Sequence, residues 1–191
     1  AHGSDLPSIL LAEAEAGGGS VAEEVVLVIA DHAGLGIGAL GGMQLPWTVA
    51  QACYAHFHAA NVATFAYCFL TIAAANLIQR FGSESQKRRF LEPLLDGRIR
   101  SAFGMTEPDV ASSDATNIAT TLRRDGDDWV IDGRKWYITG AAHPACAFVI
   151  VVGVSRPEAA RTSRHSCVIV PMKTPGLSIV RELRFMGWDD K

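Results

Sequence analysis

The feature that most constrains this chain is a long uncharged stretch, because no Asp, Glu, Lys or Arg lies between Asp31 and Arg80. About 20 consecutive apolar residues are enough to span a membrane, so a transmembrane helix has to be considered. Polar side chains nevertheless interrupt the stretch throughout, at Gln51, His56, His58, Asn61 and Asn76. Its many alanines suit close helix packing. The stretch therefore predicts buried helices over residues 47–59 and 64–81, and no membrane span.

The end of the second helix and the start of the next are marked locally. Gly82 is suited to end a helix, and Ser83-Glu84-Ser85-Gln86 reads as a capping box with Ser83 as the N-cap. Apolar residues then form one stripe, and Asp96-Gly97 ends the helix; the stripe is Phe90, Leu91, Leu94 and Leu95. The basic residues of this helix, Lys87, Arg88 and Arg89, are expected to face water.

The opening 42 residues carry little pattern. Gly34-Leu35-Gly36-Ile37-Gly38-Ala39 fits the glycine template of a dinucleotide-binding turn. Three residues separate it from the preceding apolar run, and Pro46 interrupts the helix that should follow, so a flexible glycine loop is favoured. The first residues, A-H-G-S-D, have no positive region, so a tag remnant or a truncated start is expected rather than a signal peptide.

After residue 100 the apolar period changes from helical to alternating. Strands are predicted over 118–124, 129–131 and 134–139, around the turn dipeptides Asp125-Gly126 and Asp132-Gly133. The apolar run 147–154 is predicted to be a central strand. Further strands are expected over 167–172 and 177–185, with a turn at 174–176. This second half predicts a small antiparallel barrel or sandwich.

Composition and charge argue against several classes of binding site. The net charge is −3 and no basic stripe is present, which argues against nucleic acid as a partner. The loop 155–164 carries Arg156, Arg161 and Arg164, which are expected to be solvated rather than phosphate-binding. His56 and His58 point to different faces of a helix, so no metal site is expected. The four cysteines lack C-x-x-C spacing and indicate reduced thiols of a cytoplasmic protein: Cys53, Cys68, Cys146 and Cys167.

The segment 103–117, read as F-G-M-T-E-P-D-V-A-S-S-D-A-T-N, joins the two halves. It combines small residues with hydroxyls, which can let the backbone approach a ligand and offer it hydrogen bonds. Asp, Ser, Thr and Pro are also ordinary turn residues. Composition alone therefore favours a plain capped loop.

The order of the residues points further. T-E-P followed by S-D, and then K-W-Y-I-T-G at 135–140, resembles the flavin-binding middle segment of the acyl-CoA dehydrogenase family. The full string M-T-E-P-D-V-A-S-S-D-A-T-N is similar to one branch of that family, which is sometimes fused to a kinase-like domain in animals. F-G-S-E-S-Q-K-R-R-F-L-E-P-L-L-D-G-R resembles the last helix of the family's N-terminal domain. The resemblance covers residues 43–190 well and 1–42 badly.

The resemblance implies an α+β fold, with a helical N-terminal domain over 1–100 and a β-barrel or sandwich middle domain over 101–191 that is incomplete at its C-terminus. It implies an FAD-dependent enzyme that oxidises an acyl-CoA thioester to the 2,3-enoyl-CoA. The implied partners are an electron-transferring flavoprotein or similar acceptor, and further copies of the chain in a dimer or tetramer. The family's catalytic glutamate belongs to a C-terminal helical domain, so no catalytic residue is assigned in this chain.

The resemblance also implies the binding residues. Phe103, Met105 and Thr106 would lie against the flavin ring, and Ser113 would contact both cofactor and acyl-CoA. One extra residue before the S-D pair leaves Ser112 open for part of that role. Tyr137, Ile138 and Thr139 would cover the other edge of the flavin, although most of the family has Trp at the position of Tyr137. The carboxylates of the motif, Glu107, Asp109 and Asp114, are expected to be structural.

Two other functions stay open. The chain could be a non-catalytic fragment of this fold that binds acyl-CoA or a partner subunit. It could also belong to a related flavin oxidase or monooxygenase that acts on a substrate without CoA.

Overall fold

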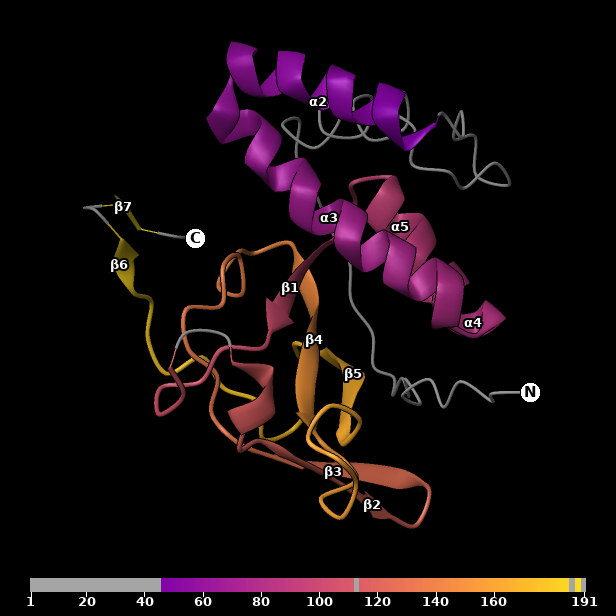
Figure 1. Cartoon of the computed structure of the whole chain (residues 1–191), viewed down its shortest axis with the longest axis vertical. Coiled ribbons are helices and arrows are strands. Elements are labelled where there is room, and N and C mark those ends of the chain that lie inside the picture. Colours follow the sequence, from indigo (N-terminus) through magenta and orange to yellow (C-terminus); the bar gives the residue numbers. More distant parts are fainter. Residues whose placement is uncertain (1–45, 112–113, 186–187, 190–191) are drawn as a thin grey trace. The chain divides into compact units, whose positions relative to one another are not determined.

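The computed structural model describes residues 46–111, 114–185 and 188–189, so the predictions for residues 1–42 and for Ser112 and Ser113 lie outside the described part. The described residues divide into two compact units, one formed by residues 46–101 and the other by the described residues from 102 to 189. Helices and strands are therefore described unit by unit (Figure 1). The combination confirms the α+β class.

The first described elements of the helical unit are α2 (Trp47–Ala60) and α3 (Val62–Phe81), which confirms both helices predicted from the uncharged stretch. Asn61 separates them in an extended conformation. Ala50 and Tyr54 of α2 are buried, and so are four residues of α3, namely Ile72, Ala74, Ala75 and Ile78. No helix in the described ranges is long and apolar enough to cross a membrane.

The capping box forms as predicted before α4 (Glu84–Gln86). The Ser83 N–H donates to Gln86 Oε1 at 2.7 Å, and the Gln86 N–H donates to Ser83 Oγ at 3.3 Å. The next turn was not predicted: Lys87–Leu91 is a π-helix, η2, in which the Glu92 N–H bonds to the Lys87 carbonyl. Pro93 follows in α5 (Glu92–Leu95) and has no N–H, which explains the shifted bonding.

The predicted apolar stripe is buried at Phe90, Leu91 and Leu94 and half-buried at Leu95. Among the basic residues, Arg88 is exposed, whereas Lys87 and Arg89 are half-buried. The helix ends at Asp96, and Gly97 follows with φ of 68°.

The strand unit is a five-stranded mixed sheet in the order β1-β4-β2-β3, with β5 also paired to β4. The strands are β1 (Arg100–Gly104), β2 (Thr121–Asp125), β3 (Asp128–Asp132), β4 (Cys146–Val154) and β5 (His165–Pro171). β4 is central, as predicted, and Figure 1 shows β5 alongside it. β2 with β3 and β4 with β5 are antiparallel, but β2 meets β4 in parallel at Thr121 and Val154.

Both faces of β4 are buried, which accounts for its unbroken apolar sequence. One face belongs to a core of seven buried residues: Ala102, Leu122, Cys146, Val149, Val151, Val168 and Val170. Cys53, Cys146 and Cys167 are free thiols, of which only Cys146 is buried and the other two are half-buried.

Two predicted strands are wrong. Residues 134–139 are irregular. Gly133, directly before them, passes so close to Thr120 that a Cβ at Gly133 would lie 2.2 Å from Thr120 Oγ1. Asp132-Gly133 is accordingly no hairpin turn, whereas Asp125-Gly126 is one.

The strand predicted over 177–185 is also mostly absent, although the turn before it, at 174–176, forms as predicted. Only β6 (Arg184–Phe185) forms, paired with β7 (Trp188–Asp189), and residues 177–183 pair with no strand of the described chain.

Candidate functional site

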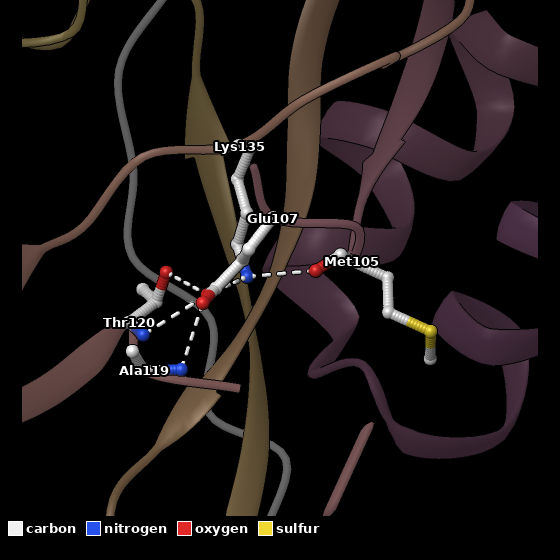
Figure 2. Close-up of polar contacts among 5 residues, drawn as sticks. All are labelled: Met105, Glu107, Ala119, Thr120 and Lys135. Atoms are coloured by element: carbon white, nitrogen blue, oxygen red, sulfur yellow. Dashed lines mark hydrogen bonds and ion pairs between the residues drawn. The ribbon is translucent and has the colours of Figure 1, made fainter. Parts of the chain in front are cut away.

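A buried carboxylate organises the loop after β1. Glu107 is 5% exposed, and its carboxylate accepts hydrogen bonds from the Ala119 N–H at 2.7 Å and the Thr120 N–H at 2.9 Å. The Thr120 hydroxyl donates a further, short hydrogen bond to the same carboxylate. Figure 2 shows these donors converging on Glu107 from the residues that lead into β2. The side chain thus fixes the T-E-P loop to the edge of the sheet.

Lys135 closes the other side of this arrangement. Its ammonium lies 2.8 Å from Glu107 Oε1 and donates to the Met105 carbonyl at 3.0 Å (Figure 2). The next residue adds a backbone contact, since the Trp136 N–H donates to the Thr106 carbonyl at 2.9 Å. Two motif segments that lie about thirty residues apart are therefore joined at three points. We call these three contacts the loop junction.

The charges of the ion pair are set by opposing effects. Burial raises the pKa of Glu107, but hydrogen bonds from Lys135, Thr120 and Ala119 outweigh it and lower that pKa from 4.5 to about 2. Burial lowers the pKa of Lys135 despite the opposing influence of the Glu107 carboxylate. Glu107 is therefore ionised at neutral pH.

The segment after Lys135 holds an aromatic ring in solvent. Tyr137 has φ of 53°, the left-handed region that bulky residues rarely adopt, and its side chain is 58% exposed. Its ring meets the Trp136 ring edge-on, with centroids 4.8 Å apart. Ile138 is half-buried and packs against the core of the sheet, which anchors the segment, while Thr139 is exposed. A strained backbone that exposes an aromatic ring is a feature that folding alone does not favour.

The other predicted residues lie on β1 and in the loop after it. Phe103 is 42% exposed on β1, and Met105 and Thr106 are half-buried beyond its end. The loop junction brings Met105 and Thr106 to residues 135–136, directly before Tyr137. Ser113, the predicted contact to both ligands, lies outside the described residues, as does Ser112.

The turn after the two serines is braced by its own carboxylate. Asp114 accepts the Thr116 N–H at 3.0 Å and the Thr116 hydroxyl at 2.6 Å, and so caps a 3-10 turn, η3 (Ala115–Asn117). Arginines of the β4–β5 loop reach the same turn: Arg164 donates to the Thr116 carbonyl at 2.8 Å, and Arg161 donates to the Asn117 side chain. The prediction that Arg164 is solvated is therefore wrong, because its side chain bridges two loops.

Sequence reasoning missed Lys135 as a site residue. It was part of the K-W-Y-I-T-G motif, but nothing local distinguishes it from a solvated lysine. The available signal was the glutamate of the linked T-E-P motif, which has no cation close to it in the sequence. Within the described residues, no group of three or more His, Cys, Asp and Glu side chains could hold a metal ion.

Comparison with known proteins matches both halves of the chain to domains of one family. The family model of the acyl-CoA dehydrogenase N-terminal domain matches residues 10–98, and that of the acyl-CoA dehydrogenase middle domain matches residues 102–191. A relative from Mycobacterium tuberculosis, named "Probable acyl-CoA dehydrogenase FadE2", is 55% identical over 115 residues, which make up 60% of this chain and 28% of the relative.

Solved structures are similar as well. One from Mycobacterium abscessus is 51% identical with a TM-score of 0.63, covering 67% of this chain and 31% of that one. A glutaryl-CoA dehydrogenase from Mycobacterium smegmatis, solved in complex with FADH2, is 25% identical with a TM-score of 0.67, covering 84% and 41%. The chain thus spans less than half the length of each of these relatives. Both halves of the sequence match, and the chain belongs to the acyl-CoA dehydrogenase family.

Proposed function

We propose that this chain is part of an FAD-dependent acyl-CoA dehydrogenase, which oxidises an acyl-CoA thioester to the 2,3-enoyl-CoA. The loop junction is the observation that supports the proposal most, because it brings together the two segments that would face the flavin. A glutaryl-CoA dehydrogenase of similar fold was solved with FADH2, which supports the same cofactor here.

The residues of these segments fit a flavin ring. Isoalloxazine needs hydrogen-bond donors at its polar edge and apolar walls that exclude water. Thr106 and Thr139 carry hydroxyls, and Phe103 and Tyr137 are aromatic side chains with large exposed fractions. The positive φ of Tyr137 is explained if its ring is held ready for a ligand rather than packed in the core.

Each residue then has a defined task. FAD, when bound, would accept the two electrons and the hydrogen that leave Cβ of the thioester. The Thr106 hydroxyl would donate to the polar edge of the ring, and Met105 and Phe103 would lie against it. Tyr137, Ile138 and Thr139 would cover the other edge and keep water out, and Ser113 would contact both cofactor and substrate. The base that takes the Cα proton is not assigned to any residue of this chain.

The partners and setting follow from the same proposal. The electrons would pass to an electron-transferring flavoprotein or a similar acceptor in the cytoplasm. The enzyme would work as a homo-oligomer, either a dimer or a tetramer. The boundary between the helical and the flavin-binding domain would lie near residue 101.

The test is the visible spectrum of the purified chain in the presence of FAD, followed without oxygen as acyl-CoA is added. A yellow protein is the expected result for the chain itself, and bleaching by acyl-CoA is expected where the part of the enzyme that supplies the base is also present. A chain that takes up no FAD contradicts the proposal and leaves a non-catalytic binding or assembly fragment. Bleaching by free acids or nitroalkanes but not by acyl-CoA would assign the chain to a flavin oxidase or monooxygenase instead.

A matched pair of threonine variants tests the binding residues. Thr106→Ala removes one hydroxyl donor and should weaken FAD binding about tenfold. Thr121→Ala removes an exposed hydroxyl from β2 and should leave FAD binding unchanged. Equal affinities of the two variants would remove Thr106 from the proposed site.

A further inference from the structure

The loop junction also fixes the direction of one particular backbone donor. The Thr106 carbonyl accepts the Trp136 N–H at 2.9 Å, and the described chain contains no cis peptide bond. In a planar trans peptide the carbonyl and the following N–H point in opposite directions. The N–H of Glu107 is therefore directed away from Trp136.

The side chain of Glu107 is fixed as well. The Glu107 carboxylate bonds to Ala119, Thr120 and Lys135, so the side chain is buried on one side of the loop. Its own N–H, in contrast, finds no acceptor among the described residues. A backbone donor that is rigidly held but unused needs a partner from water or from a ligand. Figure 2 shows the side-chain half of this arrangement, with Lys135 between Glu107 and Met105.

From this geometry, and resting on the proposed function, we propose that Lys135 is a positioning residue for flavin binding. Its ammonium ties the Glu107 carboxylate to the Met105 carbonyl and so holds the peptide between Thr106 and Glu107 in one orientation. In that orientation the Glu107 N–H donates to the polar edge of the isoalloxazine ring. Lys135 touches neither the cofactor nor the substrate in this role.

The Glu107 N–H should bind the reduced flavin more strongly than the oxidised flavin. The reduced flavin carries negative charge at its polar edge, and a fixed N–H stabilises that charge more than it stabilises the neutral oxidised ring. Loss of the fixed orientation should therefore weaken binding of reduced FAD more than that of oxidised FAD. The reduction potential of the bound flavin must then fall, whereas a purely structural role would leave it unchanged.

Lys135→Met is the variant that tests this, because it keeps the length of the side chain and leaves the three hydrogen bonds from Ala119 and Thr120 to Glu107 in place. Oxidised FAD should bind about tenfold more weakly. Reduced FAD should lose about a further tenfold, which for two electrons lowers the potential by about 30 mV. Lys173→Met, at an exposed lysine of the same unit, is the matched control and should change neither quantity.

A second measurement needs no variant. Hydrogen exchange of the Glu107 amide in the unaltered chain should slow when FAD is added, since the ligand would accept that hydrogen. An unchanged exchange rate in a chain that binds FAD overturns the inference, and so does an unchanged potential in a folded Lys135→Met. If the unaltered chain takes up no FAD, the proposed function and this inference fail together. If it binds FAD while the exchange rate or the potential stays unchanged, the inference alone fails and the proposed FAD binding stands.

Discussion

Glu107→Gln offers the sharpest test of how this loop is stabilised, because the substitution keeps the shape of the side chain and removes its charge. The pKa of Glu107 is lowered from 4.5 to about 2 in the folded chain. A difference of this size corresponds to about 3 kcal/mol of stability that depends on the ionised carboxylate. Burial of the Lys135 ammonium lowers the pKa of that group and offsets part of this contribution. The variant should unfold about 2–3 kcal/mol more easily than the unaltered chain at neutral pH.

The pH dependence gives the sign of the effect. A carboxylate whose pKa is depressed on folding stabilises the fold above its unfolded pKa, and this contribution is lost as pH falls toward the folded pKa. The stability gap between the unaltered chain and Glu107→Gln should therefore be full above about pH 5 and shrink steadily toward about pH 2. Urea denaturation followed by tryptophan fluorescence at several pH values measures the gap.

Glu158→Gln is the matched control, since Glu158 is exposed in the β4–β5 loop. It should change the free energy of unfolding by less than about 0.5 kcal/mol at any pH. A gap for Glu107→Gln that is small at neutral pH, or that does not shrink with acid, would refute the view that the buried ion pair and its hydrogen bonds hold the loop.

Three further predictions concern backbone features. Tyr137→Gly removes the strain of the positive φ and should stabilise the fold by up to about 1 kcal/mol. The same variant should bind FAD more weakly, because it lacks the exposed ring. A loss of stability with unchanged FAD binding would show that Tyr137 has a structural role only. Gly133→Ala drives a Cβ against Thr120 and should destabilise the fold by about 2–3 kcal/mol. Gly126→Ala, with open space but φ of 60°, should cost only about 1 kcal/mol. Thermal unfolding compares the two glycine variants, and equal costs would contradict the close approach at Gly133. Ser83→Ala removes the capping hydroxyl and should cost about 1 kcal/mol of stability, measured by circular dichroism; no change would mean that the capping box contributes nothing.

The parts of the fold that sequence predicted well are those with local causes. The capping box depends on residues three positions apart, and the apolar period sets the helices within a few residues. The central position of β4 follows from its unbroken apolar run, since only a strand covered on both faces needs one. The family resemblance also depended on contiguous motifs, and it is confirmed by the two matched domains.

The features that the sequence did not predict depend on contacts between residues far apart in the chain. Residues 134–139 have strand-like sequence, yet they are irregular, and the Trp136 N–H bonds to the Thr106 carbonyl of a distant loop. The ion pair between Glu107 and Lys135 joins residues 28 positions apart and has no local signature. Such tertiary constraints override strand propensity, and they carry most of the geometry of the candidate site.

The central claim is that residues 103–107 and 135–139 together form the site for an isoalloxazine ring. The most direct measurement is the amide NMR spectrum of the chain during a titration with FAD. The account predicts that the amides of these two segments shift, whereas those of the β2–β3 hairpin keep their positions. Shifts confined to the helices or the hairpin, or a spectrum that FAD leaves unchanged, would contradict it.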